Sequence, residues 1–170
     1  MKKFRPVIKP IPEKIYRIVH NSLPIVCADI VVSDGRGRFL MVKRKNEPEK
    51  GKWWFPGGRI LKNETLREGA IRKLAEETGL KPKRVKELGV YEYFNPTGYF
   101  RGTNTHAIAF PFYMEISAAK VKLDAQSSDW KWFDRASSGW HPYLKYSLKR
   151  AGFPLKGKKR KKVKITFPKQ

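Results

Sequence analysis

The sequence predicts an α/β (α+β) fold in which a mixed β-sheet is flanked by helices. Apolar runs of strand length recur between turn signals, and the segments 65–78 and 141–150 have helical patterns. A length of 170 residues is enough for one domain with a real core. We expect this main domain at 25–151, an extension with a short helix at 1–24 and a basic tail at 152–170.

The elements can be placed in chain order. We expect a helix at 13–21, strands at 25–33 and 38–43 joined by a turn at 34–37, a charged loop at 44–52, a helix at 65–78, strands at 85–94, 105–116 and 129–134, and a helix at 141–150. The Asp-Gly-Arg-Gly turn is a hairpin signal, and Pro142 suits the first position of a helix. Pro111 has no backbone N–H, so an edge or a bulge is expected there. Gly79 is expected to end its helix in the left-handed conformation.

Composition excludes several classes of protein. Cys27 is a single cysteine, which excludes an intrachain disulfide framework, and we expect it to be a buried small residue rather than a nucleophile. Trp53 and Trp54 are expected in the core, although a tryptophan can also stack on a base. No apolar run approaches 18 residues and the start of the chain has no signal-peptide core, so we expect a cytoplasmic protein without a membrane span.

The formal net charge of +23 is concentrated at the two ends of the chain. Residues 25–134 carry a net charge of +6, residues 1–24 add +5, and residues 135–170 add +12 without any acidic side chain. A basic run of this kind binds nucleic acid or anionic surfaces, or is simply a lysine-rich, solvated terminus. The tail is therefore a candidate for non-specific contact with RNA or another polyanion.

The most specific signal is the stretch 58–80, GRILKNETLREGAIRKLAEETGL. A Pro-Gly-Gly turn precedes it and lets the backbone approach a ligand. The helix then places charged residues three or four apart, where they share a face. Mg²⁺ needs only one or two carboxylates besides substrate phosphates, and Glu77 is a candidate ligand. Lys73, four residues earlier, is expected to pair with Glu77 or to face a phosphate.

This stretch resembles the Nudix box, a motif of two glycines and several glutamates around an arginine at set spacing. The matching residues are Gly58, Glu64, Arg72, Leu74, Glu76, Glu77, Gly79 and Leu80. Lys73 departs from it, because the box has glutamate there. The resemblance implies the Nudix fold and metal-dependent hydrolysis, with Mg²⁺ as cofactor and Mn²⁺ as the alternative ion. Arg72 and Glu76 are assigned catalytic roles, and Arg72 is expected to orient Glu68 and Glu76 from four residues away.

Residues 12–135 are further similar to the GDP-mannose mannosyl hydrolases, a family within this superfamily. The similar stretches include GKWWFPGGR at 51–59 and QSSDWKWF at 126–133. That family also lacks the glutamate that Lys73 replaces, and it cleaves the sugar C–O bond. The resemblance implies a metal held by a backbone carbonyl of the Gly57–Gly58 turn, by Glu77 and by Gln126.

The same resemblance implies substrate contacts from Asp29, Arg44 and Arg59. Burying Asp29 in an apolar strand without a partner would be costly, which favours a functional or ion-paired role. The arginines suit bidentate binding of phosphate, with surface cations as the alternative on so basic a chain.

At the position of the general base, this chain departs from the mannosyl hydrolase family. The family has a histidine directly after the metal-binding glutamine, where this chain has Ser127. His106 is expected to be structural, whereas His141 opens the last helix and is the candidate base. Glu76, or water activated by the metal, is the alternative.

We therefore expect a Mg²⁺-dependent hydrolase of a nucleoside diphosphate linked to another group. GDP-sugars such as GDP-mannose or GDP-glucose are the leading candidates, with GDP and free sugar as products. One alternative is P–O cleavage of nucleotides such as ADP-ribose. Another is a Nudix-fold nucleic-acid-binding module with little catalysis, suggested by Lys73, Ser127 and the basic tail. The oligomeric state is open, with a homodimer as one option.

Overall fold

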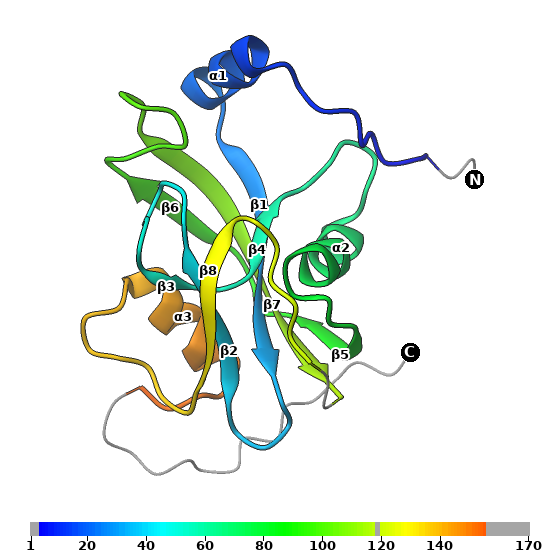
Figure 1. Cartoon of the computed structure of the whole chain (residues 1–170), viewed down its shortest axis with the longest axis vertical. Helices are drawn as coiled ribbons and strands as arrows, with labels where there is room; N and C mark the ends of the chain where they lie inside the picture. The colour runs from blue at the N-terminus through cyan, green and yellow to red at the C-terminus, as the bar shows by residue number, and fades with distance from the viewer. Residues whose placement is uncertain (1–3, 118–119, 156–170) are drawn as a thin grey trace.

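The strands pair into one mixed sheet that has helices on both faces (Figure 1), as seen in a computed structural model that describes residues 4–117 and 120–155. The elements are α1 (Glu13–Ser22), β1 (Ile25–Ser33), β2 (Phe39–Arg44), β3 (Trp53–Trp54), β4 (Gly57–Arg59), α2 (Leu66–Thr78), β5 (Pro82–Glu87), β6 (Tyr91–Asn95), β7 (Thr105–Ile116), β8 (Ser127–Phe133) and α3 (Pro142–Arg150). The predicted mixed sheet with flanking helices is confirmed.

The centre of the sheet is the parallel pair of β1 and β7. Their register runs from Ile25 opposite Ala107 to Ser33 opposite Glu115. The strand order is β3-β2-β1-β7-β5, with β4 on β1, β6 on β7 and β8 on β2, and apart from β1 with β7 the pairs are antiparallel. Central strands whose two faces are both covered have nearly continuous apolar sequences. The sequences of β1 and β7 have this pattern.

The edge of β1 that faces away from β7 changes its partner along the strand. Residues 27–29 pair with β4, whereas Val32 and Ser33 pair with β2. Farther along β2, β3 takes the place of β1 at Val42 and Lys43, whereas β8 follows the other edge of β2 over its whole length. Because β2 and β4 separate here, the sheet opens beside Asp29.

The two faces of the sheet carry separate cores, since alternate side chains of a strand point to opposite sides. On one face, Ala28 and Ile30 of β1 pack in a cluster with Leu74 of α2. On the other face, Val31 belongs to a cluster with Leu144 of α3. In Figure 1, α2 and α3 accordingly lie on opposite sides of the central strands.

Helix α2 has clear signals at both ends. The Thr65 side chain accepts a hydrogen bond from the Glu68 backbone N–H, while the Glu68 carboxylate accepts one from the Thr65 N–H. This reciprocal capping box satisfies N–H groups that a helix start leaves free. Gly79 ends the helix with φ of 68°, so the predicted left-handed cap is confirmed.

The expected single strand at 85–94 is wrong. The chain forms β5 and β6, which pair with successive parts of β7 and are separated by residues 88–90, where Gly89 has φ of 112°. The expectation of an edge at Pro111 is also wrong, because β7 has neighbours on both sides. The irregularity lies in the partner chain instead. Three residues, 88–90, stand opposite the two residues Phe110 and Pro111, since Pro111 has no N–H to offer.

Both described ends of the chain lie against the domain. Near the N-terminus, the Val7 N–H donates to the Lys62 carbonyl. Near the C-terminus, Phe153 is 3% exposed and its ring centroid lies 4.9 Å from that of Phe39. Leu155 forms a β-bridge with Ala136. The chain thus stays packed through Leu155, past the start of the predicted tail.

Residues 156–170, the rest of that tail, lie outside the described part of the chain. No helix in the described part is both long and apolar enough to cross a bilayer.

Candidate active site

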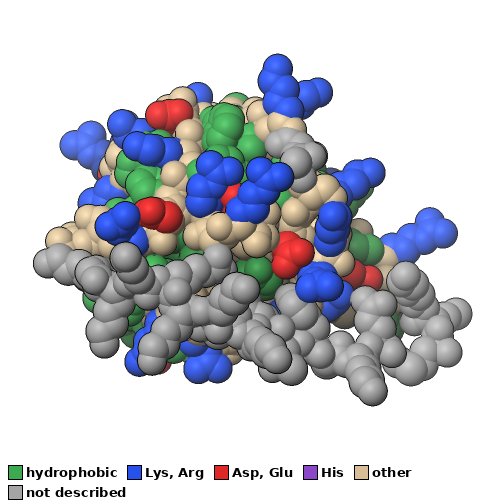
Figure 2. Space-filling view, turned by 90° about the horizontal axis from the view of Figure 1, so that it is seen from below, with side chains coloured by type: hydrophobic (Ala, Val, Ile, Leu, Met, Phe, Trp, Pro, Cys, Tyr) green, Lys and Arg blue, Asp and Glu red, His purple; other side chains and the backbone are tan. Residues whose placement is uncertain are grey.

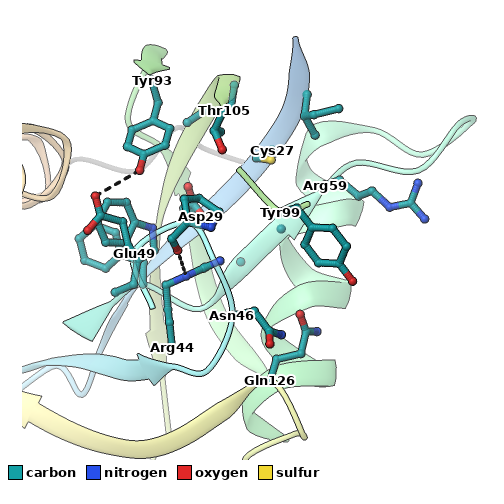
Figure 3. A pocket seen from close by; sticks show the side chains of 18 of the residues that line it. Cys27, Asp29, Arg44, Asn46, Glu49, Arg59, Tyr93, Tyr99, Thr105 and Gln126 are labelled. Atoms are coloured by element: carbon teal, nitrogen blue, oxygen red, sulfur yellow. Dashed lines mark hydrogen bonds between the residues drawn. The ribbon is translucent and has the colours of Figure 1, made fainter. Parts of the chain in front are cut away.

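A cavity of about 390 Å³ opens where β2 and β4 separate along β1 (Figure 3). Its walls include residues of the strands β1, β2, β4, β7 and β8, of all three helices, and of the loops around residues 46–49 and 99. Seven of the ten predicted site residues line it: Asp29, Arg44, Gly57, Gly58, Arg59, Glu77 and Gln126. Residues as distant in sequence as Asp29 and Gln126 therefore meet at one place.

Asp29 of β1 lines the cavity. Its Oδ2 accepts a hydrogen bond of 2.7 Å from the hydroxyl of Tyr143, which is 1% exposed. Burial raises the pKa of the Asp29 carboxyl to about 6, against the opposing effects of the Tyr143 hydrogen bond and of the Arg44 and Lys73 cations. The carboxyl can therefore hold or release a proton near neutral pH.

The close approach of β4 to β1 requires glycine at position 57. A Cβ there would collide with Asp29 and with the Ala28 carbonyl. Without a side chain, the Gly57 N–H reaches Oε2 of Glu77 at 3.0 Å. The Gly-Gly turn thus brings backbone and carboxylate together.

Lys73 and Glu77 form a buried ion pair on the wall that α2 contributes. Lys73 Nζ lies 2.7 Å from Glu77 Oε1, and the two residues are 8% and 6% exposed. Burial acts to lower the pKa of Lys73, but the Glu77 and Glu76 carboxylates outweigh it and raise that pKa. Burial raises the pKa of Glu77, and Lys73 opposes this effect. The expected Lys73–Glu77 pair is present, and the ammonium lines the cavity.

Arg72 lies outside the lining of the cavity and ties α2 to β4. Its guanidinium donates to the Glu64 carboxylate at 2.9 and 2.5 Å, to the Arg59 carbonyl at 3.1 Å and to Glu76 at 3.1 Å. Its expected contact with Glu76 is present, whereas the Glu68 carboxylate closes the capping box at the start of α2. Arg72 therefore positions the turn that carries Gly57 and Gly58.

Two other residues with a predicted catalytic role also lie away from the cavity lining. The side chain of Glu76 is 49% exposed. His141 caps α3, where its Nδ1 accepts the Tyr143 N–H at 3.1 Å, and its ring centroid lies 5.1 Å from that of Tyr93. Burial lowers the pKa of His141.

The start of β8 supplies the opposite wall. Gln126 lines the cavity, and its Nε2 donates to Asp124 at 3.1 Å, which leaves its amide oxygen for another partner. In Figure 3 it lies at the same edge as Asn46. Ser127 also lines the cavity and is buried. The position that carries the family's histidine thus faces the site, with a hydroxyl in its place.

Aromatic rings line the outer part of the cavity. Tyr16 and His20 come from α1, and Tyr99 comes from the loop after β6. The His20 and Tyr99 rings stack at 5.7 Å with an interplanar angle of 24°. The Arg59 guanidinium lies 5.0 Å from the Tyr16 ring centroid. Such a wall suits a planar group such as a nucleobase.

The tryptophans and the cysteine behave largely as predicted. Trp54 is 6% exposed within a core cluster, and Trp53 is half-buried against that cluster. Trp54 also lines the cavity. Cys27 is half-buried in the cavity wall, and burial raises the pKa of its thiol, which makes it a poor nucleophile.

Sequence reasoning missed the aromatic residues Tyr16, His20 and Tyr99 of the cavity wall, and it also missed Tyr143 and Glu49. Tyr143 has the helical surroundings of an ordinary core aromatic residue, and only the need of Asp29 for a buried donor could have pointed to it. Glu49 is 7% exposed and accepts a hydrogen bond of 2.7 Å from Asn95. It also pairs with Lys52 at 2.6 Å. Glu49 lies in the loop 44–52, for which the sequence indicates only a high density of charged residues.

The oxygen donors around the cavity fit a magnesium ion. Glu77 supplies a carboxylate, Gln126 an amide oxygen, and the Gly57–Gly58 turn backbone carbonyls. In the described residues no three His, Cys, Asp or Glu side chains gather as a metal cluster. Mg²⁺ needs only one or two carboxylates when substrate phosphates complete its shell, so the donor set is sufficient, although Lys73 already contacts Glu77.

Comparison with known proteins gives consistent results. Residues 23–151 match the NUDIX domain family. The low-salt glycan biosynthesis protein Agl8 of Haloferax volcanii is 32% identical over 139 residues, which cover 81% of this chain and 88% of that protein. The ADP-ribose pyrophosphatase of Methanocaldococcus jannaschii is 34% identical over 128 residues, which cover 75% of this chain and 71% of that protein.

Solved structures agree on the fold. The MutT NUDIX hydrolase from Burkholderia pseudomallei superposes with a TM-score of 0.63 at 22% identity, covering 76% of this chain and 98% of that chain. Nudix hydrolases generally use divalent metal ions such as Mg²⁺. On the extent of the domain match and the identity to its relatives, this chain belongs to the Nudix hydrolase family.

Proposed function

We propose that this protein hydrolyses a nucleoside diphosphate joined to a second group, and that GDP-sugars are its substrates. The observation that carries the proposal is the charge of the cavity. Arg44, Arg59 and Lys73 bring three cations to a space that also holds the carboxylates of Asp29 and Glu77. Arginine and lysine suit phosphate oxygens, so the cations would bind the diphosphate while the carboxylates serve the chemistry.

The roles of the remaining residues follow from their places in the cavity. The wall of Tyr16 and Tyr99 would hold the base, at the outer end of the site. Glu77, Gln126 and a carbonyl of the Gly57–Gly58 turn would hold the metal, which supplies charge neutralisation for the diphosphate leaving group. Asp29 lies where it can accept a hydrogen bond from the group being transferred or from water.

Two similarities favour a GDP-sugar. Residues 51–59 and 126–133 resemble GDP-mannose mannosyl hydrolases, and both stretches contribute to the cavity through Gly57, Gly58 and Gln126. The relative from Haloferax volcanii is named a glycan biosynthesis protein, and glycans are built from sugars.

The second candidate is P–O hydrolysis of ADP-ribose. It is favoured by the relative from Methanocaldococcus jannaschii, whose name is ADP-ribose pyrophosphatase and whose identity to this chain is 34%. An aromatic wall holds an adenine as well as a guanine, because every base has a π-face.

A panel of substrates in ¹⁸O-water separates these candidates. GDP-mannose, GDP-glucose and ADP-ribose are incubated with Mg²⁺, with the Glu77→Gln variant as the inactive control, and the products are identified by mass. We expect GDP and free sugar, with the label in the sugar, because attack is then at carbon. Label in phosphate, with a nucleoside monophosphate as product, would replace this proposal by the pyrophosphohydrolase. Absence of turnover on the whole panel would favour a binding module.

A further inference from the structure

We propose that the Lys73 ammonium is a built-in cation that competes with the divalent ion for Glu77 and so weakens the binding of that ion. The inference rests on the proposed role of Glu77 as a metal ligand. Lys73 stands where the Nudix box has a glutamate, and this replacement changes how the site binds a metal ion.

The first step is that the protein itself occupies both oxygens of Glu77. Lys73 Nζ lies 2.7 Å from Oε1, and the Gly57 N–H donates to Oε2 at 3.0 Å. A divalent ion that binds Glu77 directly must therefore share or displace one of these donors. The backbone N–H is fixed in β4, which is paired with β1, whereas the ammonium ends a flexible side chain, so the lysine is the partner that yields.

The second step is that Lys73 is held in this place. Its side chain is 10% exposed and contacts a second carboxylate, with Nζ 3.4 Å from Glu76 Oε2. A Cβ at position 58 would lie 2.8 Å from Lys73 Cε, so the lysine stem occupies space that only glycine leaves open. The ammonium is thus built into the turn that offers carbonyls to the metal.

The third step is electrostatic. Two cations a few ångströms apart repel each other strongly where water is largely excluded. An ammonium and a divalent ion at one carboxylate therefore weaken each other. The Lys73 ammonium also gives the site a positive charge for the diphosphate when no metal ion is bound.

The test measures Mn²⁺ binding to the full chain by calorimetry and by electron paramagnetic resonance. Lys73→Met and Lys73→Gln remove the charge, the latter keeping a hydrogen-bond donor for Glu77 in case the former does not fold. Lys73→Arg keeps the charge. Lys83→Met removes an equal charge from an exposed position of β5.

We expect the two neutral variants, Lys73→Met and Lys73→Gln, to bind Mn²⁺ at least about tenfold more tightly than the wild type. The charge-preserving Lys73→Arg variant and the Lys83→Met variant should match the wild type.

The outcomes separate this inference from the proposed function. Equal Mn²⁺ affinity in the wild type and in the neutral variants, lost in each case on Glu77→Gln, would overturn the competition and leave Glu77 as a ligand. Absence of Mn²⁺ binding in folded neutral variants would overturn both, because Glu77 would then hold no metal. A second readout is GDP binding in EDTA, which the wild type should retain and Lys73→Gln should weaken by about tenfold.

Discussion

Asp29 is a carboxyl group whose surroundings disfavour its charge. Its hydrogen-bond partner is the neutral Tyr143 hydroxyl, and within the described residues no cation lies within 4 Å of it. Burial is the largest influence on its pKa, which is raised to about 6. Sequence reasoning marked Asp29 from the family resemblance and from the cost of burying a carboxyl group. The structure adds the partner that makes this burial tolerable.

The raised pKa predicts how stability depends on pH. Since the folded state holds the Asp29 proton more tightly than the unfolded state, with a pKa of about 6 against an ordinary 3.8, stability is lost as pH rises from about 4 to about 6. Asp29→Asn cannot ionise and should keep that stability. We expect the variant to be more stable than the wild type at pH 8, by at most about 3 kcal/mol, and equal to it at pH 4.

Urea unfolding in EDTA at the two pH values measures this difference. Asp129→Asn, which neutralises an exposed carboxyl on β8, is the matched control and should not change the pH dependence. A stability difference between Asp29→Asn and the wild type that stays constant from pH 4 to pH 8 would show that the carboxyl is not held protonated. Activity of Asp29→Asn should fall, since its carboxylate faces the substrate cavity.

Helix α2 is the element that positions the site. Its N-terminus is held by the capping box of Thr65 and Glu68, and its C-terminus by Gly79. Between them, Arg72 anchors the helix to the Arg59 carbonyl, and further along the helix Glu77 reaches the Gly57 N–H. The spacing of Arg72 and Glu77 along α2 therefore sets the positions at which the helix contacts the β4 wall of the cavity.

Thr65→Ala should lower the free energy of unfolding by about 1 kcal/mol, because it removes the side-chain oxygen that accepts the Glu68 N–H. Thr65→Ser keeps that oxygen and should stay close to the wild type. Substrate turnover should hardly change in either variant, since Thr65 does not line the cavity. Urea denaturation gives the stability, and an unaltered midpoint for Thr65→Ala would mean that the capping box contributes nothing measurable.

At the scale of the whole molecule, charge is the distinguishing feature. Figure 2 shows Lys and Arg side chains distributed over one face, with fewer Asp and Glu side chains between them. The sequence from 156 to 170 adds eight basic residues and no acidic one. Such a segment binds polyanions through counterion release, without reading a sequence.

Removal of residues 156–170 should abolish retention on heparin or RNA at moderate salt, while hydrolysis of the proposed nucleotide-sugar substrate stays nearly unchanged. The truncation begins after Leu155, because Phe153 is part of the core. A full-length chain with the eight basic residues replaced by glutamine is the control for length. Salt-dependent elution measures the effect. Equal RNA binding by the truncated protein would assign the contact to the folded domain, and loss of hydrolysis in a folded protein would place the tail at the active site.

Local patterns in the sequence are enough to predict most of the elements. The end of α2 at Gly79 and the hairpin after β1 depend on residues close together in the chain, so propensity and capping rules apply to them. The spacing within 58–80 likewise places Glu77 and Lys73 on one helical face, because they are four residues apart. What the sequence alone determined about this protein is therefore its family, its main helix and the kind of chemistry that the helix carries.

The tertiary structure decided the contacts between distant segments. Tyr143 reaches Asp29 across 114 positions, and no local pattern encodes that meeting. The division of 85–94 into two strands depends on Pro111 of a neighbouring strand. The placement of His141 beside Tyr93, outside the cavity lining, depends on how α3 packs on the sheet. The physical reason is the same in each case: these contacts arise from burying side chains of several elements together, and their geometry exists only once the chain has folded.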